Sequence, residues 1–166
     1  TAAGAVKASN RAQRLQIAFE KGAVTVISDT ARIRFGLRGY GYGSSLRPVA
    51  LAEPVPIKNR VEYRRGNLTE WYVNDERGLE QGVTLAQRPE HSADATGPLR
   101  LELGFETDLL ASVTADGQAL RFQDRPGRAV FRFNKLVVLD ATGRTVPSRM
   151  EIIQPANRNE FSRSAL

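Results

Sequence analysis

The chain has 166 residues, with 24 Lys or Arg, 18 Asp or Glu, one histidine and no cysteine. The lack of cysteine excludes disulfides, thiolate zinc sites and cysteine nucleophiles, and the single His91 excludes a multi-histidine metal site. No apolar run approaches the roughly 20 residues that a membrane-spanning helix needs. We therefore expect no metal, no cofactor and no membrane insertion.

The net charge of +6 is distributed unevenly along the chain. Residues 1–65 hold 12 basic and 4 acidic side chains, residues 66–124 hold 4 and 11, and residues 125–166 hold 8 and 3. A nucleic-acid-binding domain usually presents one dominant basic face. Here an acidic segment lies between two basic ones, which favours ion pairs within the fold. We expect no nucleic-acid partner, and a polyanion-binding surface remains as the alternative.

The first third of the chain predicts strands. Residues 5–16 are compatible with one or two helical turns or with the start of a strand. The segment IAFEKGAVTVI (17–27) predicts two strands joined by a turn at Lys21-Gly22. In ARIRFGLRG (31–39) apolar residues alternate with arginines, as in half-buried antiparallel strands. Residues 38–58 are rich in Gly and Pro and predict a long connection.

The second half repeats this pattern, with turn residues between the strands. LRLELGFE (99–106) places four apolar residues on one face of a strand, after an exposed loop over residues 87–98. Asp116-Gly117 predicts a tight hairpin, because this dipeptide tolerates the positive φ angles of such turns. Pro126-Gly127 predicts another turn, and Thr142-Gly143 is expected to precede a last strand.

Turns at such short spacing are typical of a β-sandwich or barrel. We predict an all-β fold, an antiparallel β-sandwich with a barrel-like alternative, of roughly 10–12 strands and little helix. We expect residues 1–153 to form a single sandwich domain and residues 154–166 to be a C-terminal tail or linker.

One acidic stretch, TEWYVNDERGLEQG (69–82), raises the question of catalysis. A glycosidase needs two carboxyl groups about 5.5 to 9.5 Å apart that face one cleft. However, Asn-Asp initiates turns, and a calcium loop would need more regularly spaced oxygen donors. We therefore predict a solvated hairpin, and keep as the alternative a glycan hydrolase that uses Glu70, Asp75, Glu76 or Glu80.

Aromatic and basic residues are the candidates for ligand or partner contact. Trp71 is expected to anchor the core, with sugar stacking as the alternative. The loop GYGYG (39–43) is expected to be an accessible contact surface. A row of arginines is predicted to be a solvated strand face that also discourages edge pairing, or else a site for acidic polysaccharide; it comprises Arg32, Arg34, Arg38, Arg60, Arg64 and Arg65. The resulting contact candidates are Tyr40, Tyr42, Trp71, Tyr72, Arg32, Arg34 and Arg64.

Four segments carry a resemblance to a known kind of module. They are NRVEYRRGNLTEWYVNDERGLEQGVTL (59–85), GPLRLELGF (97–105), ADGQALRFQD (115–124) and LVVLDATGRTVPSRMEI (136–152). Together they resemble an N-terminal module of large secreted bacterial proteins that continue into SBBP-type or FG-GAP (integrin-like, β-propeller) repeats. Val83 departs from the phenylalanine expected there.

The resemblance implies a secreted or cell-surface β-module of a multidomain bacterial protein, without catalytic residues to transfer. We therefore expect a non-enzymatic module that acts in domain packing, protein interaction or adhesion. Its partners would be other domains of the same polypeptide or surface proteins. A carbohydrate or anionic-glycan binding module is the first alternative and the hydrolase the second.

Overall fold

The computed structural model describes residues 5–90 and 97–153, and these residues form thirteen β-strands and no helix. The predicted all-β class is thereby confirmed. Contacts divide the chain into two compact units, Thr1–Asp108 and Leu109–Leu166. The expectation of a single domain over residues 1–153 stays a prediction. His91 and residues 154–166 lie outside the described residues.

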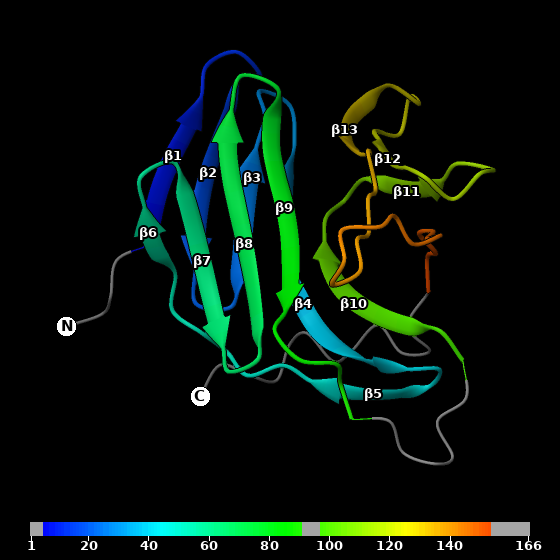
Figure 1. The fold of residues 1–166 in the computed structure, drawn as a ribbon. Helices are drawn as coiled ribbons and strands as arrows, with labels where there is room; N and C mark the ends of the chain where they lie inside the picture. The colour runs from blue at the N-terminus through cyan, green and yellow to red at the C-terminus, as the bar shows by residue number, and fades with distance from the viewer. Residues whose placement is uncertain (1–4, 91–96, 154–166) are drawn as a thin grey trace, which may run out of the picture. The chain divides into compact units, whose positions relative to one another are not determined.

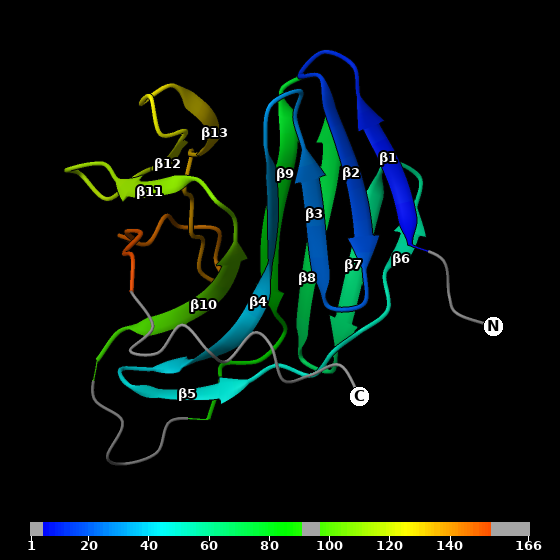
Figure 2. The same cartoon turned by 180° about the vertical axis from the view of Figure 1, so that it is seen from behind.

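The first unit is an antiparallel β-sandwich of two sheets (Figures 1 and 2). Sheet A has the order β1-β2-β3-β4-β10, with β5 paired to β4; its strands are β1 Val6–Asn10, β2 Leu15–Glu20, β3 Ala23–Ile27, β4 Arg32–Tyr42, β5 Ser45–Pro48 and β10 Leu99–Glu106. Sheet B has the order β6-β7-β8-β9; its strands are β6 Val55–Ile57, β7 Arg60–Arg65, β8 Leu68–Asp75 and β9 Gly78–Leu85.

The core of the sandwich lies between the two sheets. The alternation in β4 buries Ile33, Phe35 and Leu37, as predicted. The ring of Tyr72 on β8 contacts Phe19 on β2 edge-on, with ring centroids 5.5 Å apart. The Tyr63 hydroxyl on β7 lies 2.9 Å from the carbonyl oxygens of both Glu20 and Ala23 at the β2–β3 turn. These contacts join sheet B to sheet A, because aromatic rings span the gap of about 10 Å between packed sheets.

The N-terminal half resolves one open alternative and corrects one prediction. Residues 5–16 form strand β1, a turn and the start of β2, so the strand alternative is confirmed over the helical one. Residues 38–48 belong to a β4–β5 hairpin, so the predicted long connection is wrong over this part. Gly41 allows the hairpin because a Cβ at this position would lie 2.3 Å from the Ser45 carbonyl oxygen. The glycines of GYGYG therefore serve close strand packing.

Strand β10 also differs from its predicted form. The alternation was expected to place all four apolar residues of β10 against the core. Leu103 and Phe105 are half-buried opposite Leu37 and Phe35, but Leu99 and Leu101 are 43% and 41% exposed. The register shifts between Glu102 and Leu103, and the end of the β4–β5–β10 layer extends past sheet B (Figures 1 and 2). No second layer from sheet B covers this end.

The second unit contains one small sheet of order β11-β12-β13, with β11 Leu110–Val113, β12 Leu120–Gln123 and β13 Ala129–Phe133. Leu120 and Phe122 are buried, and the Phe122 ring contacts Phe133 at a centroid distance of 5.9 Å. The hairpin at Asp116-Gly117 is confirmed, although six residues, 114–119, connect the strands in place of a two-residue turn.

The same five-residue turn occurs twice in the second unit. In residues 124–128 the Asp124 amide donates to the Arg128 carbonyl over 3.0 Å, and the Gly127 amide donates back to the Asp124 carbonyl over 2.9 Å. The Asp124 carboxylate also accepts the Arg128 amide over 2.8 Å. Residues 140–144 repeat this pattern. The turn at Thr142-Gly143 is therefore confirmed.

The strand predicted after that turn is absent, since only the bridge between Leu139 and Thr145 forms and residues 146–153 are in no strand. Pro147 lacks the amide that a ladder needs. Residues 148–150 instead lie against the 114–119 connection, where the Met150 backbone amide donates to the Gly117 carbonyl over 2.7 Å and the Gln118 side-chain amide donates to the Ser148 carbonyl over 2.7 Å.

Candidate functional site

The acidic stretch forms the β8–β9 hairpin, as predicted, but one of its carboxylates lies inside the sandwich. Glu70 is 1% exposed. Its Oε1 accepts the Tyr72 hydroxyl over 2.6 Å and the Gln81 side-chain amide over 3.0 Å, while Oε2 accepts the Arg65 guanidinium over 3.0 Å. The expectation that all four carboxylates decorate the surface is therefore wrong for Glu70.

Buried partners compensate the charge of Glu70. The Arg65 side chain is 4% exposed, its Nε donates to the Ala50 carbonyl over 2.7 Å, and its guanidinium lies 5.3 Å from the centre of the Tyr63 ring. Burial, and next the charge of Glu70, raise the pKa of Tyr72 well above its usual value. The Tyr72 hydroxyl thus stays protonated and donates to the carboxylate. Glu70 and Arg65 therefore form a structural ion pair. Hydrogen bonds from Tyr72 and Gln81 to Glu70 complete the buried network.

The remaining carboxylates of the hairpin do not face Glu70. Asp75 lies at the end of β8, where the Arg77 guanidinium lowers the pKa of its carboxyl by a side-chain hydrogen bond. Glu76 and Glu80 are exposed, and Glu80 pairs with Val73, at the opposite strand parity from Glu70. These positions do not give the two carboxyl groups facing one cleft that the hydrolase hypothesis requires. In the described ranges 5–90 and 97–153, no group of three or more potential metal-ligating side chains occurs.

Trp71 lies on the outer face of sheet B, where it is half-buried, so its predicted role as core anchor is wrong. Its indole ring covers Gly82 on the neighbouring strand: a Cβ at that position would lie 2.0 Å from Cζ2 of the ring. The Arg60 guanidinium lies 4.3 Å from the ring centre, and the indole N–H donates to Thr84 Oγ1 over 3.2 Å. The ring fills the gap beside a glycine in an edge strand and leaves little free surface for a sugar.

A substitution at this glycine tests the packing of Trp71. We expect Gly82→Ala to lower the free energy of unfolding by about 1 to 3 kcal/mol, because the new methyl group displaces the ring. Trp71 is the only tryptophan of the chain, so its fluorescence maximum reports the displacement as a red shift. Thr84→Ala is the control, since it removes the indole hydrogen bond and leaves the space beneath the ring. An unchanged spectrum for Gly82→Ala would contradict this packing.

The predicted arginine row is divided between the two sheets. On β4 of sheet A, Arg32 is exposed, while Arg34 forms ion pairs with Glu20 at 3.0 Å and Glu106 at 3.2 Å. On the outer face of β7 in sheet B, Arg64 forms an ion pair of 2.8 Å with Glu62, which also binds Arg60 at 2.7 Å. Ion pairs within the first unit therefore engage several of these arginines, as the alternation of charge along the chain predicted.

The two tyrosines of GYGYG are positioned by β4. Tyr42 is 8% exposed, and its hydroxyl accepts the Arg88 guanidinium Nε over 2.9 Å. Tyr40 is half-buried and pairs with Arg47 on β5. Tyr72 is buried in the core and Trp71 lies on the outer face of the other sheet, so the structure does not bring the aromatic contact candidates together.

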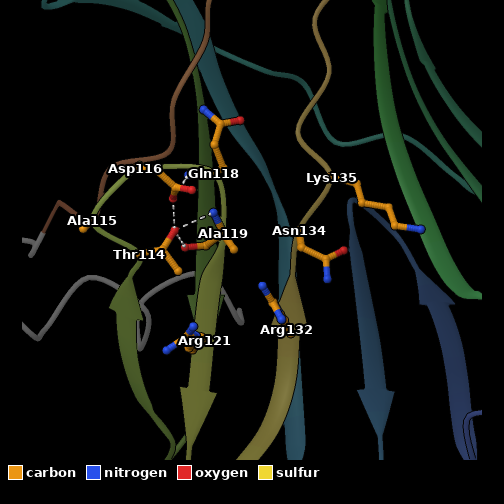
Figure 3. Close-up of a pocket in the computed structure, with 9 residues that line it drawn as sticks. All are labelled: Thr114, Ala115, Asp116, Gln118, Ala119, Arg121, Arg132, Asn134 and Lys135. Carbon is orange, nitrogen blue, oxygen red and sulfur yellow. Dashed lines mark hydrogen bonds between the residues drawn. The ribbon is translucent and has the colours of Figure 1, made fainter.

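A depression of about 600 Å³ in the second unit brings together residues that the sequence analysis did not select (Figure 3). It is lined by Thr114, Ala115, Asp116, Gln118, Ala119, Arg121, Arg132, Asn134 and Lys135. Strand register explains the arrangement: Arg121 on β12 lies directly opposite Arg132 on β13, on the face away from Leu120 and Phe122. The alternation in LRFQ and AVFRF, with the turn at Pro126-Gly127, contained the signal for this pair.

The part of the chain that the structure describes contains no helix long and apolar enough to cross a membrane. Comparison with protein-family models, with curated proteins and with solved structures finds no match to this chain.

Proposed function

We propose that this chain is a non-catalytic β-module of a multidomain secreted or cell-surface bacterial protein. Its work is to pack against a neighbouring domain of the same polypeptide through its second unit. The resemblance of four segments to such modules supports the context. The distribution of apolar side chains in the second unit supports the packing role and is the observation that carries the proposal.

The second unit has more exposed large apolar residues than buried apolar residues. It supplies eight of the fourteen exposed large apolar residues among those described: Leu110, Val113, Val137, Val138, Leu139, Val146, Ile152 and Ile153. This unit makes up less than a third of the described chain. It supplies only three of the sixteen buried apolar residues, Ala119, Leu120 and Phe122. Exposed apolar side chains in such numbers favour an interaction surface.

The edge of the small sheet adds backbone groups to this surface. Strand β11 is paired only with β12, and its residues Leu110 to Val113 are all exposed. An unprotected edge strand can accept a strand from a neighbouring chain or domain. A domain that docks here would bury Leu110 and Val113 and form hydrogen bonds with the backbone groups of β11 that do not face β12.

Amide hydrogen exchange tests this proposal without knowledge of the partner. We expect the β11 amides that do not face β12, and the amides of residues 151–153, to exchange rapidly in the 166-residue chain. In the longer polypeptide that the proposal assumes, the same amides should exchange at least about tenfold more slowly, because docking protects them. The core strands β3 and β4 provide the internal reference. Equal rates in the two forms, or full protection already in the shorter chain, would overturn the proposal.

The glycan-binding alternative on Tyr40, Tyr42, Trp71 and the arginines is less well supported. Sugar stacking needs an open aromatic face, whereas Trp71 lies between Gly82 and Arg60 and Tyr42 is buried. Arg34 and Arg64 already bind carboxylates of the first unit. The hydrolase alternative is disfavoured because Glu70 is committed to its ion pair with Arg65.

A further inference from the structure

The depression in the second unit contains two arginines that lie opposite each other on neighbouring strands. Arg121 and Arg132 are direct partners in the β12–β13 ladder and both are exposed. Side chains at such positions have Cβ atoms about 4.5 to 5.5 Å apart, and like charges there repel. No carboxylate among the described residues forms an ion pair with either guanidinium, whereas Arg128 on the same hairpin binds Asp124 at 2.8 Å.

The one acidic group of the depression, Asp116, interacts with the charge of Arg132 and offsets only part of the charge of the pair. The Asp116 carboxylate accepts the Thr114 hydroxyl over 2.5 Å and the Gln118 amide over 3.0 Å (Figure 3). These hydrogen bonds, foremost that from Thr114, lower the pKa of Asp116, so it is ionised and its Oδ1 is occupied. Three basic residues line the depression against this single acid. The Lys135 side chain extends away from the arginines in Figure 3 and is not needed for the site.

We propose that Arg121 and Arg132 form an oxyanion site for the carboxylate or sulfate group of an acidic saccharide. A guanidinium presents two parallel N–H groups to a carboxylate or sulfate, and two guanidinia on one face can bind one such group together. The bound anion removes the repulsion between them. This inference is independent of the packing role proposed above.

The lining of the depression favours a sugar over a nucleic acid. Base recognition on single strands uses aromatic stacking, and none of the nine lining residues is aromatic. The Asn134 side-chain amide in the lining can hydrogen-bond the hydroxyl groups of a saccharide. The volume of about 600 Å³ lies within the range of small-ligand sites.

Binding measurements on the whole chain test the site. The probes are a tetragalacturonate, a sulfated disaccharide, a neutral oligosaccharide of equal length and a short single-stranded DNA, each titrated at low salt and followed by calorimetry and by NMR of the arginine side chains. We expect binding of the two acidic saccharides, and at least about tenfold weaker binding by Arg121→Gln and by Arg132→Gln, as loss of a charge-assisted hydrogen bond implies. The neutral saccharide should not bind.

Arg125→Gln is the matched control. Arg125 is an exposed residue of the β12–β13 turn outside the depression, so its loss changes the net charge equally and should leave affinity within about twofold. If all three variants bind the acidic saccharides equally weakly, the loss of affinity reflects net charge alone, and the proposed site is contradicted. Absence of saccharide binding, or equally tight binding of the DNA, would overturn it as well.

Thermal unfolding provides a second test of the site that does not require high affinity. Without ligand, Arg121→Gln is expected to raise the midpoint of thermal unfolding by about 1 to 2 °C, because it removes the cross-strand repulsion. Saturating tetragalacturonate should raise the midpoint of the unmodified chain more than that of the variant. A midpoint lowered by the substitution would show that Arg121 stabilises the free protein, and would contradict the inference.

Discussion

Replacing Glu70 with alanine is expected to lower the free energy of unfolding by about 3 to 5 kcal/mol. The substitution leaves the Arg65 guanidinium buried without its carboxylate, and Arg65 Nη2 already lacks a hydrogen-bond partner. An unpaired charge in the interior costs far more than the loss of a surface ion pair. Urea unfolding followed by Trp71 fluorescence measures the change.

Two further variants separate the buried charge from the loss of packing. Glu80→Ala removes an exposed carboxylate of the same hairpin and should cost less than about 0.5 kcal/mol. The double variant Glu70→Leu with Arg65→Met removes both charges and keeps similar volume, so it should recover most of the stability. Tyr72 and Gln81 remain hydrogen-bonded to each other, at 3.0 Å. A Glu70→Ala cost as small as that of Glu80→Ala would contradict the buried ion pair.

Phe122→Ala is expected to unfold the second unit and to leave the first unit folded. Removing a buried phenylalanine costs about 3 to 5 kcal/mol. Phe122 is 1% exposed and is one of only three buried apolar residues described in this unit. A unit of this size buries too little surface to absorb such a loss. Two-dimensional NMR should show the amides of residues 109–153 at unfolded positions while the Trp71 indole signal stays in place.

The matched control for this prediction is Phe122→Leu, which keeps an apolar side chain of moderate volume at the same position. This variant should retain folded signals in both units. If Phe122→Ala instead displaces the Trp71 indole signal together with those of residues 109–153, the chain unfolds as one cooperative unit. That result would contradict separate stability of the two units and favour the single domain expected from the sequence.

The sandwich was predictable from the alternation of apolar and polar side chains, and the errors have particular physical causes. In a strand Glu70 shares its face with Tyr72 and lies opposite Trp71, so the expectation that Trp71 anchors the core depended on the size of its side chain. The sequence did contain the missing signal: Val61, Tyr63 and Arg65 alternate toward the same face, and the turn at Gly66 brings Arg65 close to Glu70. Opposite charges at inward positions of one hairpin indicate a buried pair.

Other errors could not be avoided from local sequence. The exposure of Leu99 and Leu101 depends on the register shift beside Glu102 and on where sheet B ends, both of which are properties of the assembled sheets. Residues 146–153 have apolar side chains suited to a strand, but no strand in the described part of the chain forms a ladder with them. In contrast, the pairing of Arg121 with Arg132 could have been predicted from the sequence, because the turn at Pro126-Gly127 sets which residues of the two strands lie opposite each other.

The repeated aspartate turns imply an order of assembly. Residues 124–128 and 140–144 close through hydrogen bonds over only four residues, so chain entropy hardly opposes them, and hairpins of this type form in about 1 to 10 μs. In contrast, β10 must find β4 across the whole of sheet B, since Leu99 pairs with Tyr42. Pairing of such distant segments is slow. A full-length chain that refolds from the unfolded state thus forms these two turns before its first sheet is complete, and the edge of β4 opposite β3 and β5 stays open until β10 pairs with it.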